Sequence, residues 1–172
     1  MAKDFPRLPD RIFMRQVILP RLAARAPARV VSFGCRPYSL DIHEDLDAAG
    51  IEVWTADIDP AAAEWGMPGR HLTGDASRLE TLPGLPPVDA IICNGVLGWG
   101  VDAEDDVRRA LRGFHAALSP SGLLILGWNT DTLPDPANLP EWKLFAPAFA
   151  FHDPARVTFE SVTHVYDFLE RP

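Results

Sequence analysis

Short apolar runs alternate with amphipathic segments along most of the chain. Five runs have the pattern of buried strands, because each is apolar on both faces and ends in a glycine or polar residue. They span residues 29–33, 52–56, 70–73, 88–93 and 123–128. Residues 156–171 are also rich in strand-forming residues, with no helical segment between them, and they predict two antiparallel strands at an edge of the sheet.

Helices are predicted between these runs. The clearest spans residues 102–118, where four acids precede or begin the helix and apolar side chains recur at helical spacing. These apolar residues are Val107, Leu111, Phe114 and Leu118. Residues 11–26 also have helical composition, and Pro20 is expected to kink this helix or divide it. Ser39 is a candidate N-cap of a short helix that stops at Gly50, and Pro60 begins a further helix.

This alternation predicts an α/β fold with a doubly wound, mostly parallel sheet and helices on both faces. The turn expected at residues 119–122 would separate the helix at 102–118 from the strand at 123–128. With 172 residues, 47% of them apolar, the chain can bury one sizeable core. We expect a single domain over residues 1–172, made of an N-terminal helical segment (1–27) and an α/β core (28–172).

Charge is divided unevenly along the chain. Residues 1–36 carry eight Lys or Arg against two Asp, whereas the whole chain has a net charge of -8. An acidic body argues against a general nucleic-acid binder. The sequence contains neither an apolar run of the roughly 18 to 20 residues that a membrane span needs nor a secretory signal, so we expect a cytoplasmic protein without membrane contact. Cys35 and Cys93 are far apart and lack CxxC spacing, so no disulfide framework or metal site is expected.

The ends of the strands are where ligands bind in such sheets. After the first strand, Gly34 permits a tight turn, but Arg36 and Ser39 replace the second and third glycines of a GxGxxG loop. The dinucleotide fingerprint is therefore incomplete. This counts against a nucleotide-dependent oxidoreductase, whose cofactor pyrophosphate needs close approach to the backbone.

Two acids follow the next strands. Asp57 lies twenty-three residues beyond Gly34, about the separation at which a carboxylate accepts hydrogen bonds from both hydroxyls of a ribose. The alternative role, an acid at a helix N-terminus, is better filled by Asp59. Asp75, after the third strand, could accept from the exocyclic amine of an adenine while Ala76 N–H donates to a ring nitrogen, or could serve only as an N-cap.

These features resemble the class I S-adenosylmethionine-dependent methyltransferases, over roughly residues 28–172. The resemblance is carried by RVVSFGCR, VWTADIDP, GDAS, VDAIICNGVLGWG and LSPSGLLILGW, and VTHVYDFLER looks like the antiparallel seventh strand of that fold. It implies a Rossmann-like, seven-stranded sheet and S-adenosyl-L-methionine as cofactor. The cofactor-binding residues that it implies follow the strands in order: Gly34, Cys35, Arg36, Tyr38, Asp57, Ile58, Asp75, Ala76, Asn94 and Gly95.

The acceptor is expected to be a small or medium-sized molecule methylated on oxygen or nitrogen. CNGVLGW follows the fourth strand, where neither an Asn/Asp-Pro-Pro-aromatic motif nor a Pro-Cys nucleophile is found, so adenine amines, glutamine amides and cytosine C5 are disfavoured. The N-terminal helix, residues 94–102 and residues 128–152 remain to form the acceptor pocket. They contain several candidate side chains, for which core packing is the alternative: Trp99, Trp128, Asn129, Trp142, Phe145 and Phe149.

The remaining hypotheses concern catalysis and charge. His43, His152 and Asp102 are candidate general bases, but none has a partner visible in sequence, so no catalytic residue is assigned. The N-terminal arginines, Arg11 and Arg15 among them, could receive an acidic acceptor or simply dock the helix on an acidic body. The alternative to an enzyme is a non-catalytic binding or regulatory protein that kept the fold with an altered glycine loop.

Overall fold

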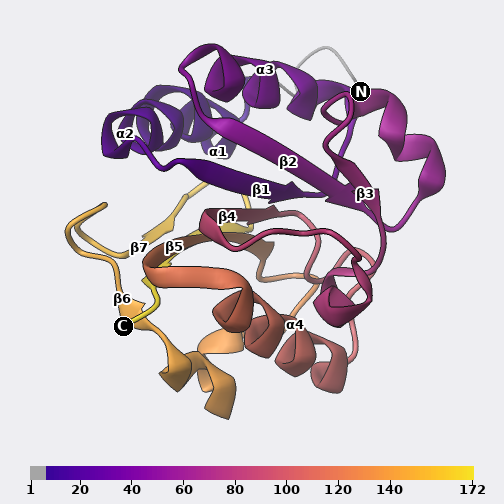
Figure 1. Ribbon diagram of the computed structural model, residues 1–172. Coiled ribbons are helices and arrows are strands. Elements are labelled where there is room, and N and C mark those ends of the chain that lie inside the picture. Colours follow the sequence, from indigo (N-terminus) through magenta and orange to yellow (C-terminus); the bar gives the residue numbers. More distant parts are fainter. Residues whose placement is uncertain (1–6) are drawn as a thin grey trace.

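A computed structural model describes residues 7–172 of the protein. These residues form one mixed β-sheet with helices on both faces (Figure 1). The strands are β1 (Arg29–Phe33), β2 (Glu52–Asp57), β3 (His71–Thr73), β4 (Val88–Asn94), β5 (Leu118–Asn129), β6 (Ala146–Pro147), β7 (Arg156–Thr158) and β8 (His164–Glu170). Their order is β3-β2-β1-β4-β5-β8-β6, and β7 also pairs with β8. The first five are parallel, and β6, β7 and β8 are antiparallel to their neighbours.

The predicted fold class is confirmed, with three corrections. The sheet has eight strands rather than seven, because β6 and β7 both pair with β8. For the same reason β8 is covered on both sides and does not form the edge of the sheet. The turn expected at residues 119–122 lies within β5 as an irregular stretch, where Ser121 has a φ of 60° and the register against β4 shifts between Val88 and Ala90.

The N-terminal helix has three parts. They are α1 (Pro9–Phe13), the π-helical turn η2 (Met14–Ile18) and α2 (Leu19–Arg25). Pro20 stands in the first turn of α2, where its missing N–H matters least, and the hydrogen bonding widens to a π-helix just before it. The helical residues are continuous from Pro9 to Arg25, so the irregularity near Pro20 is a π-helical turn and not a break in the helix. Met14 and Leu19 are buried there, whereas Ile12 is 40% exposed.

The other α-helices are α3 (Leu40–Ala48) and α4 (Glu104–Ala117). Ser39 precedes α3 as predicted, but its hydroxyl makes no cap on that helix and instead accepts from Arg36 N–H at 2.9 Å. Residues 60–65, expected to begin a helix, form only a short 3₁₀ helix. The 3₁₀ segments are η3 (Pro37–Ser39), η4 (Pro60–Trp65), η5 (Ala76–Thr81), η6 (Pro136–Asn138) and η7 (Pro140–Leu144).

Alternate residues of the strands pack against opposite layers. Val30 and Ile92 face α2 and α3, and Val31 and Ile91 face α4, in two separate apolar clusters. In Figure 1 the N-terminal helices and α3 cover one face of the sheet and α4 covers the other. Since the strands are buried on both faces, their sequences are apolar almost throughout.

The basic N-terminal segment is docked on the acidic body. Arg15 pairs with Asp41 at 3.0 Å, Arg25 with Glu170 at 3.3 Å, and Arg29 with Glu52 at 2.8 Å. Much of the charge asymmetry is therefore explained by docking. Within residues 7–172, no helix is both long enough and apolar enough to span a membrane.

Candidate functional site

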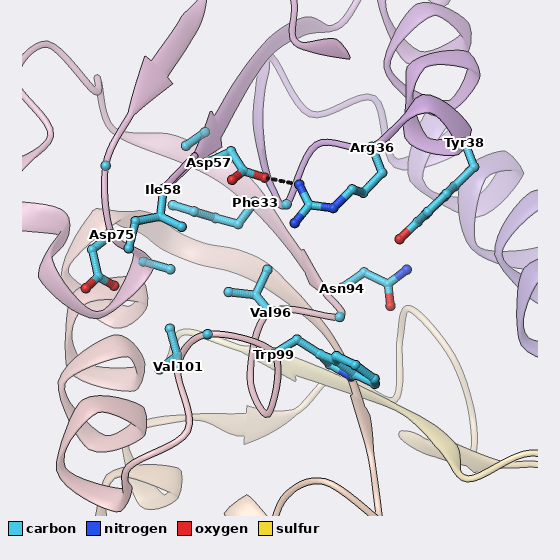
Figure 2. A pocket seen from close by; sticks show the side chains of 16 residues that line it. Phe33, Arg36, Tyr38, Asp57, Ile58, Asp75, Asn94, Val96, Trp99 and Val101 are labelled. Carbon is cyan, nitrogen blue, oxygen red and sulfur yellow. Dashed lines mark hydrogen bonds and ion pairs between the residues drawn. The ribbon is translucent and has the colours of Figure 1, made fainter. Parts of the chain in front are cut away.

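A cavity opens at the carboxyl ends of β1, β2, β3 and β4 (Figure 2). The strand order reverses between β1 and β4, which is the position where ligands bind in doubly wound sheets. The cavity holds about 560 Å³ including its open mouth. Its lining residues come from the strand ends and following loops: Phe33, Gly34, Arg36, Tyr38, Ala56, Asp57, Ile58, Gly74, Asp75, Ala76, Asn94, Gly95, Val96, Trp99, Gly100 and Val101.

Asp57 is the most strongly held polar residue of this cavity. Its Oδ2 accepts from Cys35 N–H at 2.7 Å and from Arg36 Nη1 at 3.1 Å. Its Oδ1 accepts from Asp59 N–H at 2.9 Å. The residue is only 6% exposed, so the backbone fixes the carboxylate at the cavity wall. A carboxylate has about four acceptor positions, and Arg36 must release one of them before Asp57 can bind both hydroxyls of a ribose.

Arg36 reaches across the cavity toward the end of β2. Figure 2 shows its guanidinium turned to Asp57, with the Tyr38 and Asn94 side chains nearby at the opposite end of the cavity from Asp75. Arg36 Nη1 also donates to Cys35 O at 2.7 Å, yet the side chain remains 47% exposed. Because nearly half of the Arg36 side chain is exposed, a ligand can reach it and replace these part-buried contacts.

The two other acids near the cavity, Asp59 and Asp75, each cap the start of a 3₁₀ helix. Asp59 caps η4, because its Oδ1 accepts from Ala61 N–H at 2.9 Å. Asp75 caps η5 through Oδ1, which accepts from Ser77 N–H at 2.8 Å, and it also lines the cavity. Ile58, 61% exposed, lies on the same side of the cavity as Asp75 in Figure 2. This end combines an acid with an apolar surface, which suits a flat, polar-edged ring.

Gly34 lies where the backbone turns from β1 into the loop. Its φ is +86°, a left-handed conformation that side chains disfavour, and a Cβ there would lie 3.0 Å from Val96 Cγ2. A single glycine therefore supplies both the turn and the space between the loops after β1 and β4.

Nine of the ten predicted cofactor-binding residues line this cavity, and Cys35 does not. The Cys35 side chain is fully buried, and burial raises the pKa of its thiol to about 12. Its contribution is the backbone N–H that holds Asp57. The structure thus brings the predicted residues together at one edge of the sheet, while their binding roles stay predictions.

A second, wider cavity adjoins the first at one end only. It is lined by Leu8, Asp10, Arg11, Arg36, Tyr38, Gly95, Trp99, Asn129, Val162, Thr163 and His164, and it holds about 1200 Å³ including its open mouth. Arg36, Tyr38, Gly95 and Trp99 line both cavities, whereas Asp75 lines only the first. Any small molecule in the second cavity therefore meets the Tyr38 end of the first.

The candidate acceptor residues separate into two groups. Trp99, 63% exposed, and Asn129 line the second cavity, as does the start of the N-terminal helix. Trp128 and Phe145 are buried in the core, and Trp142 packs against the same cluster. Phe149 is 59% exposed and lines neither cavity.

None of the candidate bases lines either cavity, although Asp102 is hydrogen-bonded to Gly100, which lines the first. His43 is buried beneath β1, with Nε2 3.0 Å from Ser32 Oγ. His152 Nδ1 contacts Pro154 O at 2.7 Å, and Asp102 Oδ1 accepts from Gly100 N–H at 3.0 Å.

Sequence reasoning did not single out Asp10 and His164 of the second cavity. A signal for His164 was present, because a strand antiparallel to β5 must begin at the carboxyl end of β5, beside the site. Asp10 is 154 residues away along the chain and offered no comparable signal.

No family model matches the chain, and no curated protein matches it in sequence. Solved structures do match. A TehB-like SAM-dependent methyltransferase from Corynebacterium glutamicum is 18% identical, with a TM-score of 0.66 over 90% of this chain and 86% of that one. The N-methyltransferase NodS from Bradyrhizobium japonicum, in complex with S-adenosyl-L-homocysteine, is 17% identical, with a TM-score of 0.69 over 99% and 94%.

A third match is the 16S rRNA N2 G1207 methyltransferase RsmC from T. thermophilus, in complex with AdoMet and guanosine. It is 20% identical, with a TM-score of 0.59 over 90% of this chain and 42% of that one. At these identities the likeness establishes the fold. The chain has the Rossmann-like fold of the S-adenosylmethionine-dependent methyltransferases, with a cavity at the switch point of its sheet.

Proposed function

We propose that the protein is an S-adenosylmethionine-dependent methyltransferase. The observation that carries the proposal is the cavity at the switch point, where Gly34, Asp57 and Asp75 follow three adjacent strands in order. The similar solved structures are described as methyltransferases, and two of them hold S-adenosyl-L-homocysteine or AdoMet.

The residues present fit this cofactor. Asp57 offers a fixed carboxylate for the ribose, and Asp75 with Ala76 offers an acceptor and a backbone N–H beside the apolar surface of Ile58 for the adenine. Gly34, Arg36, Tyr38, Asn94 and Gly95 form the other end, for the methionine part. When bound, the cofactor supplies an electrophilic methyl group on a sulfonium. The protein then has to align the acceptor with the methyl–sulfur bond and exclude water.

The acceptor proposed here is a small molecule that carries an acidic group. The second cavity adjoins the proposed methionine end of the first and is lined by two arginines, Arg11 and Arg36, against one acid, Asp10. Arg11 pairs with Asp10 and Arg36 with Asp57, so an acidic ligand would share or replace these contacts. Arg15, the other arginine considered from the sequence, pairs with Asp41 and lines neither cavity. The expectations of a cytoplasmic protein without a nucleic-acid partner stay predictions.

Calorimetry with S-adenosylhomocysteine tests the proposal. We expect binding by the wild-type protein, at least tenfold weaker binding by Asp57→Asn, and unchanged binding by Asp45→Asn. Asp45 is an exposed residue of α3, so it is a matched control. Absence of binding at high protein concentration would sink the proposal.

One observation favours the alternative of a non-catalytic binding or regulatory module. Arg36 occupies the carboxylate that a ribose needs. If Arg36 closes the site permanently, the protein does not bind S-adenosylhomocysteine. If the protein is a non-catalytic module that retains the cofactor, S-adenosylhomocysteine binds but no tested acceptor gains a methyl group.

A further inference from the structure

Three buried acceptor atoms without a hydrogen-bond partner belong to residues that line the two adjoining cavities. They are Asp10 Oδ1, Asn94 Oδ1 and His164 Nε2. Asp10 and His164 line the second cavity, and Asn94 lines the first. A buried acceptor without a donor costs free energy, and a ligand that supplies donors would recover it.

Two of these atoms lie over the same glycine. Gly127 of β5 pairs with Asn94 on one side and Tyr166 on the other. A Cβ on Gly127 would lie 2.1 Å from Asn94 Oδ1 and 2.8 Å from His164 Nε2. The absent side chain leaves both acceptors side by side above the strand.

The third acceptor is brought to them by the N-terminal helix. Tyr166 Oη, on β8, donates to Asp10 O at 3.3 Å and so holds the start of α1 on the sheet. Asp10 Oδ2 lies 3.3 Å from Arg11 Nε, which leaves Oδ1 for a ligand. Both Asp10 and His164 are only 4% exposed.

His164 acts here as an acceptor and not as a donor. Its Nδ1 lies 3.2 Å from Asn129 Oδ1, which can only accept, so the ring proton belongs on Nδ1 and Nε2 carries a lone pair. Burial lowers the pKa of His164 to about 4. The Asp10 carboxylate opposes this shift, and the smaller effect of the Arg11 charge adds to it. The imidazole is therefore neutral near pH 7.

We propose that Asp10, Asn94 and His164 bind the nitrogen of a primary amine, the methyl acceptor. This inference rests on the proposed methyltransferase function. The two N–H groups of a neutral amine match His164 Nε2 and Asn94 Oδ1, and its lone pair stays free for the methyl carbon. A hydroxyl brings one donor and would leave two of the three acceptors unsatisfied, whereas the neutral amine leaves only Asp10 Oδ1, which faces the positive charge that develops on nitrogen during transfer.

The transfer balances without a further reactant. The amine sheds its extra proton to water before it enters. Its nitrogen lone pair forms the new N–C bond while the C–S bond of the sulfonium breaks and leaves its electron pair on sulfur. Positive charge passes from sulfur to nitrogen, where the Asp10 carboxylate stabilises it. The product leaves as a methylammonium and S-adenosylhomocysteine.

A pair of ligands tests the site by binding alone. Sinefungin is an analogue of S-adenosylmethionine in which a carbon bearing a primary amine replaces the sulfur and its methyl group, whereas S-adenosylhomocysteine has no donor there. We expect the full-length protein to bind sinefungin at least tenfold more tightly, because the amine gains charge-assisted hydrogen bonds. Calorimetry gives both dissociation constants.

Substitutions of Asp10 and His164 test whether these two residues cause the preference for sinefungin. In Asp10→Asn and His164→Phe we expect the ratio of the two dissociation constants to fall to about threefold or less, while affinity for S-adenosylhomocysteine changes little and shows that the fold is intact. Asp45→Asn and His115→Phe are matched controls, since neither residue lines the two cavities, and they should keep the full ratio.

The outcomes separate the two proposals. If neither ligand binds the wild-type protein, the proposed function fails, and this inference fails with it. If both ligands bind equally, or the preference survives in Asp10→Asn and His164→Phe, the amine site is overturned while the cofactor site stands.

Discussion

Arg36 and Asp57 form an ion pair inside the cavity at the switch point, with Arg36 Nη1 3.1 Å from Asp57 Oδ2. Asp57 is also held by the N–H groups of Cys35 and Asp59, so its position does not depend on the arginine. The ion pair therefore restricts access to a carboxylate that is already fixed. A ribose that binds Asp57 would therefore have to displace the Arg36 side chain.

Removing Arg36 should open the site. We expect Arg36→Ala to bind adenosine, which lacks the amino-acid part of the cofactor, up to about fivefold more tightly, because a half-exposed ion pair contributes at most about 1 kcal/mol. Calorimetry with adenosine measures this change. Lys143→Ala, which removes an exposed positive charge outside the cavities, is the control. Weaker binding by Arg36→Ala would show that Arg36 contacts the ligand instead of competing with it.

Variants at Gly34 and Gly50 distinguish the effect of backbone strain from that of crowding in the cavity. Both have a φ of +86°, but only at Gly34 would a Cβ meet another side chain, Val96. We expect Gly34→Ala and Gly50→Ala each to lower the free energy of unfolding by about 1 kcal/mol or more, because alanine disfavours this conformation. Only Gly34→Ala should weaken binding of S-adenosylhomocysteine, as measured by calorimetry. Equal effects of both variants on binding would contradict a role of Gly34 in the site.

Two buried histidines should make stability depend on pH. Burial lowers the pKa of His43 and of His164 from 6.5 to about 4, with His71 also lowering that of His43. The unfolded chain then binds more protons than the native one between these values, so stability is complete above about pH 6.5 and falls as the pH decreases toward about 4. From about pH 7 to pH 5, each histidine should remove up to about 2 kcal/mol.

Urea unfolding at the two pH values measures this loss. His43→Gln should lose less stability over that interval than the wild-type protein does, since glutamine does not titrate. An identical pH dependence in the variant and the wild-type protein would contradict the account.

Arg156 neutralises a buried carboxylate in the C-terminal part of the sheet. Asp167, 2% exposed, accepts from Arg156 Nε at 2.6 Å and from Trp128 Nε1 at 2.8 Å. Burial raises the pKa of Asp167 in spite of these partners. We expect Arg156→Met to lower the free energy of unfolding by about 3 kcal/mol, since it leaves a buried charge with the indole as its remaining partner.

Arg25→Met is the comparison for this variant. Arg25 pairs with Glu170, and both side chains are about a third exposed, so its loss should cost about 1 kcal/mol or less. Urea unfolding measures both variants. Adding Asp167→Asn to Arg156→Met should recover part of the loss. A loss as small as that of Arg25→Met would show that the buried charge is not the cause.

The strands were predictable because each is buried on both faces. The predicted range of β1 agrees with Arg29–Phe33, and β2 and β4 extend by one residue each beyond the predictions, to Asp57 and Asn94. Because the ends of parallel strands meet at one edge, nine of the predicted cofactor residues line one cavity. Residues 60–65 were harder, since a six-residue segment has too little periodicity to distinguish an α-helix from a 3₁₀ helix.

Contacts between distant segments were not predictable. The side chain of Arg36 could have pointed to solvent, and its contact with Asp57 depends on a rotamer that no local pattern specifies. Asp10 and His164 share a cavity only because α1 docks on β8, through a hydrogen bond between residues 156 positions apart. That docking depends on the packing of the whole N-terminal helix.

The most direct test is a crystal structure of the protein soaked with S-adenosylhomocysteine. We predict the ribose hydroxyls on Asp57 with Arg36 displaced, the adenine beside Asp75 and Ile58, and the sulfur directed toward the junction with the second cavity. A crystal in which the ligand lies elsewhere, or in which the cavity stays empty with Arg36 still on Asp57 at saturating ligand, would contradict the account.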